Sequence, residues 1–278
     1  MNVRLRKHDP CNGRAVLLRG FDIWRRGSAA PPLLAAMNLL AAGGGVAAAT
    51  NDLSDAEIQG RHLAQQLLEQ GPGTNFVQNG VLNIRAGKGK HSEIPVRFQT
   101  TVNGTGWQTI FETTSQSNRV CLIVMHKAGR PNEYYLREGL EVLDKEEDGK
   151  STALVDSKLM TPFAGSDFWV ADLGLEFFHW PAQKILKHAM TRGRACKVLE
   201  STNPSPSTNG YSRVVSWIDN DSGGIVHADA YDVKGKLLKE FDPKSFKKVN
   251  GQWELQEMEI RNVQTGSRTR LEFDLKKE

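Results

Sequence analysis

The final stretch of the sequence, residues 211–275, decides the fold: YSRVVSWIDNDSGGIVHADAYDVKGKLLKEFDPKSFKKVNGQWELQEMEIRNVQTGSRTRLEFDL. Turn-forming sequences divide it at residues 221–224, 233–236, 250–251 and 264–267. Between these turns the chain reads as strands, and the last strand alternates strictly through Leu271, Phe273 and Leu275. Short turns at this spacing predict an antiparallel meander of hairpins.

The segment from Gly80 onward is divided in the same way and predicts a second run of strands. The strand-like runs are 80–89, 92–104, 106–115, 119–129, 132–139 and 140–150, with a further run at 194–202. Their short connections predict antiparallel neighbours. Within residues 106–113, Trp107, Thr109 and Phe111 are expected on one face of the strand, because successive side chains alternate between faces.

Two helical segments are predicted. The first opens the domain after residue 50, with Asp52 or Ser54 as N-cap and the sequence Gly-Pro-Gly at 71–73 as its end. Its apolar residues at helical spacing are Leu53, Ile58, Leu63, Leu67 and Leu68.

The second helical segment is predicted within residues 172–191. Asp172 is the expected cap of a short turn, and Pro181 begins a longer helix that ends at Arg192 and Gly193. The fold class that follows is α+β. A long antiparallel sheet does not stay flat, so we expect a strongly curved sheet, an open half-barrel whose concave face receives helices or a ligand.

Basic charge is concentrated in the first 49 residues. The chain holds 36 Lys or Arg and 32 Asp or Glu, and residues 1–49 contain seven of the basic and two of the acidic residues. Arg25 and Arg26 precede an apolar stretch that ends in small residues before Thr50, which is typical of a secretion signal. We therefore expect a signal peptide or leader at 1–49 and a single soluble periplasmic domain at 50–278. An uncleaved anchor, a twin-arginine signal and a start at Met37 stay open.

The sequence contains no complete motif for catalysis or for metal binding. Residues 87–90 (GKGK) lack the spacing of a phosphate-binding loop, and no serine lies in a G-x-S-x-G sequence. His227 and Asp229 share a strand face, which is at most half of a metal site. Cys121 and Cys196 lie in apolar runs, where a buried thiol and a disulfide both remain open. The sequence predicts no enzyme, no cofactor and no metal.

Nucleic acid is excluded as a partner on charge. Beyond the leader the chain is close to neutral, and its aromatic residues do not alternate with Arg or Lys on a shared strand face. What stands out instead is the aromatic content of residues 163–180. These side chains fit either a core or the rim of an apolar cavity for a lipid-like ligand, and both interpretations stay open.

Several segments resemble the bacterial outer-membrane lipoprotein-sorting proteins, relatives of the periplasmic Lol-type lipoprotein carriers. They are LMTPFAGSDFWVADLG (159–174), RACKVLES (194–201), YSRVVSWID (211–219), GIVHADAYDVKGKLLKEFD (224–242) and VNGQWELQEMEIRNVQTGSRTRLEFD (249–274). The resemblance runs from about Ala56 to Leu275. Where the family tends to carry S-D-F-S/T-Y-E-D-L, this chain has Trp169 and Ala171 at the tyrosine-like and acidic positions. A polar role of these two positions is thus in doubt.

The resemblance implies a half-open barrel closed by helices around an apolar cavity that accepts acyl chains. It implies a periplasmic, non-enzymatic carrier of lipoprotein acyl chains or lipid towards the outer membrane, with envelope proteins as donor and acceptor and transient contact with a membrane surface. The alternative is an envelope protein-protein interaction or sensing module on the same fold. The expected lipid-binding residues are Trp107, Phe111, Ile123, Tyr135, Phe163, Phe168, Trp169, Phe178, Trp180 and Trp217.

Overall fold

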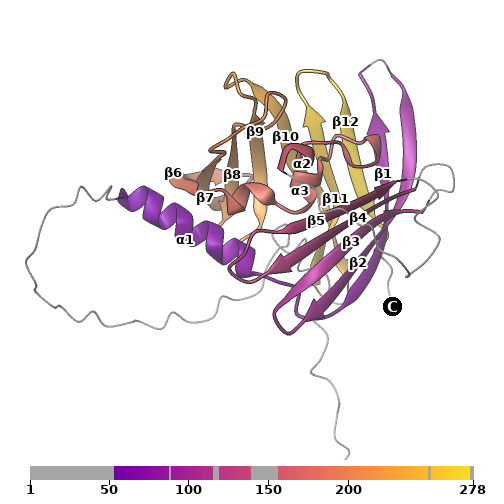
Figure 1. Cartoon of the computed structure of the whole chain (residues 1–278), viewed down its shortest axis with the longest axis horizontal. Coiled ribbons are helices and arrows are strands. Elements are labelled where there is room, and N and C mark those ends of the chain that lie inside the picture. Colours follow the sequence, from indigo (N-terminus) through magenta and orange to yellow (C-terminus); the bar gives the residue numbers. More distant parts are fainter. Residues whose placement is uncertain (1–52, 88, 115–118, 139–155, 250–251, 276–278) are drawn as a thin grey trace, which may run out of the picture.

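The computed structural model describes residues 53–275 except 88, 115–118, 139–155 and 250–251. The leader predicted at 1–49 and the strand predicted at 140–150 lie outside the described residues. The described chain is built around one sheet of 12 strands, in the order β5-β4-β3-β2-β1-β12-β11-β10-β9-β8-β7-β6. The sheet curves around a set of short helical segments and is not closed, because β5 and β6 are free edges (Figure 1).

The elements follow the order helix, five strands, short helices, seven strands. The strands are β1 (Phe76–Arg85), β2 (His91–Asn103), β3 (Gly106–Thr113), β4 (Val120–Lys127), β5 (Glu133–Glu138), β6 (Ala182–Thr191), β7 (Arg194–Thr202), β8 (Arg213–Asp219), β9 (Ile225–Tyr231), β10 (Leu237–Val249), β11 (Gln252–Asn262) and β12 (Arg268–Phe273). The helical segments are α1 (Asp55–Glu69), α2 (Asp156–Leu159), η3 (Phe163–Gly165), α3 (Val170–Leu173) and η4 (Glu176–His179).

All neighbouring strands pair antiparallel, as the turn spacing predicts. The two runs of strands meet where β1 pairs with β12, from Gly80 opposite Phe273 to Arg85 opposite Arg268. A Cβ atom on Gly80 would lie 2.6 Å from the carbonyl oxygen of Glu272. The glycine therefore allows the close backbone approach that joins the first and last strands into one sheet.

Helix α1 confirms the first predicted helix. It begins after Ser54, which forms a capping box with Glu57. In this motif the backbone N–H of Ser54 donates to Glu57 Oε2 at 2.8 Å. Leu63 and Leu67 are buried, and the helix packs on β6. A Cβ atom on Gly60 would lie 2.5 Å from the backbone nitrogen of Lys184, so the helix lies directly on the strand backbone at this point.

The second predicted helix is wrong, because residues 182–191 form strand β6. Their composition favours a helix, but pairing with β7 overrides that preference, and Gln183 and Ile185 alternate inward as buried strand residues. Arg192 and Gly193 both have positive φ, at 50° and 74°. They form the two-residue turn of a β-hairpin rather than the end of a helix.

The inner face of the sheet is the face that carries Phe98 and Phe111. The two rings make an edge contact with centroids 5.6 Å apart, and Phe98 also packs on Phe273 at 5.6 Å. The segment from α2 to η4 lies across this face, and Phe163 reaches Phe111 at 6.4 Å. The main core therefore lies between the sheet and this segment, which Figure 1 shows in front of the strands.

Candidate functional site

Residues 161–174 are anchored to the inner face of the sheet by polar contacts as well as by aromatic packing. The backbone N–H of Asp167 donates to Thr269 Oγ1 at 2.9 Å. The Asp167 carboxylate accepts hydrogen bonds from the hydroxyl groups of Ser267 and Thr269. These contacts fix the segment to β12, so the aspartate of the family-like sequence SDF has a structural role here.

Lys239 of β10 anchors the same segment from a second strand. Its side chain is fully buried, and Nζ donates to the carbonyl oxygen of Asp167 at 2.7 Å. Nζ lies 3.6 Å from Asp172 Oδ2 and 3.5 Å from the ring centroid of Trp169, which in turn stacks on Tyr211 at 4.5 Å. Burial lowers the pKa of Lys239 to about 7, although Asp172 and Asp167 oppose the shift.

The middle of the curved sheet is therefore a packed core that contains a buried lysine–aspartate pair. Phe163 and Phe168 are each 1% exposed, and Trp169 is occupied by its contacts with Lys239 and Tyr211. Phe111 is also buried in this core. The aromatic-rich segment was expected to form either a core or the rim of an apolar cavity, and these positions form a core.

A large cleft lies to one side of this core, between α1 and the tips of two hairpins. Its volume is about 650 Å³. The wall is formed by residues 104–107 from the β2–β3 turn, 126–132 from the β4–β5 turn, 178–181 at the end of η4, Gln183, and the α1 residues Arg61, Ala64, Gln65, Leu68 and Glu69. We call this space the α1 cleft.

Three of the expected lipid-binding residues meet in the α1 cleft: Trp107, Phe178 and Trp180. The Trp107 ring stacks on His126 with centroids 4.6 Å apart and an interplanar angle of 17°. On its other side the ring faces Gly71, where a Cβ atom would lie 2.6 Å from Cζ3. The tryptophan is thus held between β4 and the chain that leaves α1.

Two histidines stand beside Trp107 in the wall of the α1 cleft. Burial lowers the pKa of His126 to about 4, and the neighbouring His179 adds to the shift while Asn132 opposes it. Burial also lowers the pKa of His179 to about 4. Both imidazoles are therefore uncharged at neutral pH. Neither histidine could be predicted as a site residue from the sequence, because no motif links residues 126 and 179.

The remaining expected residues do not reach the α1 cleft. Ile123 and Tyr135 pair across β4 and β5, and alternate with the inward-facing Leu122 and Tyr134. They therefore lie on the outer face of the sheet. Trp217 is also outward, paired with His227 on β9 and tilted against its ring at 5.0 Å.

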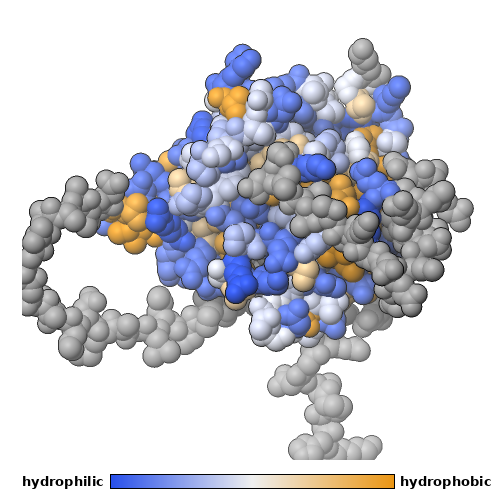
Figure 2. Space-filling view, in the orientation of Figure 1, coloured by the Kyte–Doolittle hydropathy of each residue, from blue (hydrophilic) through white to orange (hydrophobic). Residues whose placement is uncertain are grey.

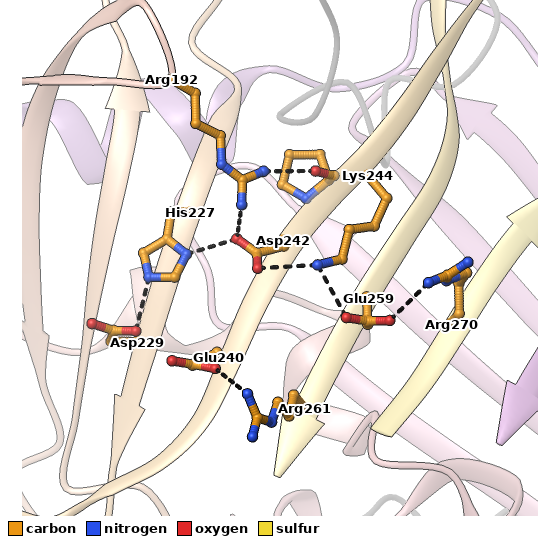
Figure 3. A network of polar contacts seen from close by, with 10 residues as sticks. Arg192, His227, Asp229, Glu240, Asp242, Lys244, Glu259, Arg261 and Arg270 are labelled. Carbon is orange, nitrogen blue, oxygen red and sulfur yellow. Dashed lines mark hydrogen bonds and ion pairs between the residues drawn. The ribbon is translucent and has the colours of Figure 1, made fainter. Parts of the chain in front are cut away.

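A network of charged groups covers the outer face of β9 to β12, as Figure 3 shows. His227 lies between two carboxylates, with Nδ1 2.8 Å from Asp242 Oδ1 and Nε2 2.9 Å from Asp229 Oδ1. Burial alone would lower the pKa of His227, but the hydrogen bonds to both aspartates raise it to about 9. Arg192 and Lys244 extend the network from Asp242.

Each cation of this network is paired with a carboxylate. A pocket of about 190 Å³ beside it is lined by Arg192, Arg194 and Lys244, but each of these cations already has a carboxylate partner. Among the described residues, no group of three His, Cys, Asp or Glu side chains is arranged to hold a metal ion. Cys121 and Cys196 are not bonded to each other.

The described surface is mostly hydrophilic in the view of Figure 2, with hydrophobic residues in small separate groups outside the grey atoms. In the described part of the chain, no helix combines the length and the apolar composition needed to span a membrane. Of these two pockets, the α1 cleft has the larger volume, and aromatic side chains contribute to its wall.

Solved structures of three bacterial proteins share this fold. A DUF1329 family protein from Desulfovibrio piger is 18% identical, with a TM-score of 0.62 over 80% of this chain and 92% of that one. A putative outer membrane lipoprotein-sorting protein domain from Vibrio parahaemolyticus is 20% identical, with a TM-score of 0.62 over 78% and 91%. A LolA superfamily protein from Nitrosomonas europaea is 16% identical, with a TM-score of 0.54 over 80% and 92%.

The chain therefore has the fold of lipoprotein-sorting and LolA superfamily structures, and the resemblance predicted from its sequence is confirmed at the level of the fold. A family model described as "-like: Uncharacterized protein" matches residues 148–276. No curated protein matches the chain. At these identities the similarity concerns the fold, so function has to be argued from the site.

Proposed function

We propose that the protein is a periplasmic, non-enzymatic binder or carrier of lipoprotein acyl chains or lipid, and that the α1 cleft holds the acyl chain. In this proposal α1 closes one side of the curved sheet, while the middle of the sheet is a permanent core. The lipid-binding residues narrow to Trp107, Phe178 and Trp180, with Leu68 and Ala64 added from α1.

The observation that carries the proposal is the size and lining of the α1 cleft. Its volume of about 650 Å³ falls within the range of ligand-binding pockets, roughly 300–1,000 Å³. Aromatic and aliphatic side chains from three separate elements converge on it, and charged residues stand at its rim. Apolar walls with a few polar groups are typical of sites for amphiphilic ligands.

Carrying an acyl chain through water requires shielding and no catalytic group. Each CH₂ kept from water contributes about 0.8 kcal/mol, so a chain of ordinary length contributes on the order of 10 kcal/mol. Release then needs an envelope partner, a membrane surface or a movement of α1 that weakens the contacts. The proposal therefore includes a donor and an acceptor, whose identities are open.

The test compares two variants of α1 that introduce the same side chain. Leu68→Trp fills the α1 cleft, whereas Gln66→Trp adds the same ring on an exposed position of the helix that does not line it. The purified protein is extracted for lipid mass spectrometry, and displacement of a fluorescent fatty acid is measured for each variant. We expect bound lipid in the parent and in Gln66→Trp, and an affinity at least about tenfold lower in Leu68→Trp, which corresponds to 1.4 kcal/mol.

A parent protein that neither retains nor binds lipid would refute the proposal. The alternative function is an envelope protein-protein interaction or sensing module on the same fold. The observation that favours it is the core itself, since the segment from α2 to η4 already fills the middle of the inner face. That alternative would be supported if the protein bound no lipid and if Leu68→Trp and Gln66→Trp bound a protein partner with equal affinity.

A further inference from the structure

We propose that the α1 cleft recognises an uncharged acyl carbonyl, the ester or amide group that joins an acyl chain to its head, through the indole N–H of Trp107 and the imidazole of His179. This inference rests on the proposed function and adds the chemical class of the ligand. It distinguishes an esterified or amide-linked lipid from a free fatty acid.

The first step is the unsatisfied donor of Trp107. The Nε1 atom is buried and has no hydrogen-bond partner, although the residue lines the α1 cleft. The ring is held on both sides, by His126 and by Gly71, so it cannot easily turn its N–H outward to water. An indole N–H can only donate, so the missing partner is an acceptor. A buried donor without a partner is destabilising, and a ligand oxygen that accepts its hydrogen bond would remove this cost.

The second step is the unsatisfied nitrogen of His179. Its Nε2 atom is also buried without a partner, and the residue lines the same cleft. His179 lies close enough to His126 to add to the lowering of the pKa of that ring. As a neutral imidazole, His179 can present an N–H at Nε2 toward the same ligand group. The cleft thus offers two neutral groups that can donate, and the side-chain oxygen of Asn132 adds a buried acceptor that also has no hydrogen-bond partner.

The third step is the charge of the site, which decides between an ester and a carboxylate. Trp107, His126, His179 and Asn132 are all uncharged at neutral pH, and a buried carboxylate without a cation is strongly disfavoured. The cations of the cleft stand at the rim instead. Lys127 is paired with Glu133 at 2.7 Å.

Arg61 of α1 and Arg130 of the β4–β5 turn are both exposed and line the cleft from different elements. They suit a charged head group at the mouth, while the acyl chain and its carbonyl lie within. The arrangement therefore matches an amphiphile that is neutral at the junction of chain and head, as in an acylated glycerol or an N-acylated terminus.

The experiment uses three probes with the same chain length: methyl palmitate, palmitate and hexadecane. Each is titrated at pH 7 against the protein saturated with anilinonaphthalene sulfonate, whose displacement reports binding. We expect methyl palmitate to bind at least about tenfold more tightly than palmitate. Trp107→Phe removes the donor and should weaken methyl palmitate about 2- to 10-fold, the equivalent of one net hydrogen bond, while hexadecane binding stays within about twofold.

A second measurement needs no variant of uncertain folding. In ¹⁵N-labelled parent protein, the indole N–H resonance of Trp107 should move downfield with methyl palmitate and stay in place with hexadecane. Palmitate that binds as tightly as its methyl ester, or an indole resonance that responds equally to both probes, would overturn the inference and leave acyl binding intact. Failure of all three probes to bind would refute the proposed function itself.

Discussion

Replacing Lys239 by methionine tests how the segment 161–174 is held on the sheet. The substitution keeps a long unbranched side chain but removes the ammonium group from the fully buried position. The carbonyl of Asp167 then loses its donor at 2.7 Å, and Asp172 loses the cation 3.6 Å away. Asp172 Oδ2 keeps the backbone N–H of Trp169 at 2.7 Å and the hydroxyl of Tyr211 at 3.2 Å.

The expected cost follows from leaving one charge buried and unpaired. Removing one partner of a buried ion pair costs about 3–5 kcal/mol, whereas total stabilities are about 5–15 kcal/mol. The double variant Lys239→Met with Asp172→Asn no longer buries a lone carboxylate. We therefore expect the double variant to be more stable than the single variant Lys239→Met.

Urea unfolding followed by tryptophan fluorescence measures both variants. With a slope of about 1–3 kcal/mol per M, the midpoint of Lys239→Met should fall by roughly 1–5 M. The double variant should recover part of this loss. A single variant within 0.5 kcal/mol of the parent, or a double variant whose loss equals the sum of the two single losses, would refute the coupling argued from these contacts.

Three further predictions concern other parts of the fold. The raised pKa of His227 contributes stability that is fully present below about pH 6.5 and is lost as the pH rises through about 9. His227→Gln should therefore lower the free energy of unfolding by about 2–3 kcal/mol at pH 7 and by little at pH 10. A difference in urea unfolding that does not depend on pH would contradict this. Alanine usually stabilises a helix relative to glycine, but Gly60→Ala should destabilise the protein by about 1–3 kcal/mol because its Cβ would lie 2.5 Å from the Lys184 backbone. Gln59→Ala is the control, and equal urea midpoints for the two variants would count against this packing. Gly71→Val should displace the Trp107 ring and change its fluorescence maximum, and an unchanged spectrum would show that the two do not touch.

Local sequence patterns predicted those elements in which the conformation that the residues favour is also the one that the fold imposes. Ser54 and the apolar stripe predict α1, and the turns at 233–236 and 264–267 lie between strands as expected. Strand β6 shows the opposite case, in which helix-favouring residues are recruited to the sheet by pairing with β7. The sequence did contain a correct signal, because Arg192-Gly193 fits a two-residue hairpin turn as well as a helix end.

The candidate site was only partly predictable, since it depends on which segments the fold brings together. Aromatic content pointed to Trp107 and Trp180, but not to the side of the sheet on which the cleft lies. Lys239 and the buried Phe241 are two residues apart on one strand, so their side chains face the same side of the sheet. The inward direction of Lys239 was therefore predictable from the alternation of side chains along the strand. Its partner Asp172 lies in a different segment, and only the three-dimensional arrangement shows why a charge is tolerated there.

Photo-crosslinking with an acyl ester that carries a diazirine near the end of its chain tests the central claim most directly. The parent protein is irradiated with the probe, and the labelled residues are located by peptide mass spectrometry. The account predicts adducts in α1 residues 61–69, in residues 126–132 and around Phe178 to Trp180, with loss of labelling in Leu68→Trp. Labelling concentrated on the outer face of β8 to β12, or labelling that Leu68→Trp leaves unchanged, would contradict it.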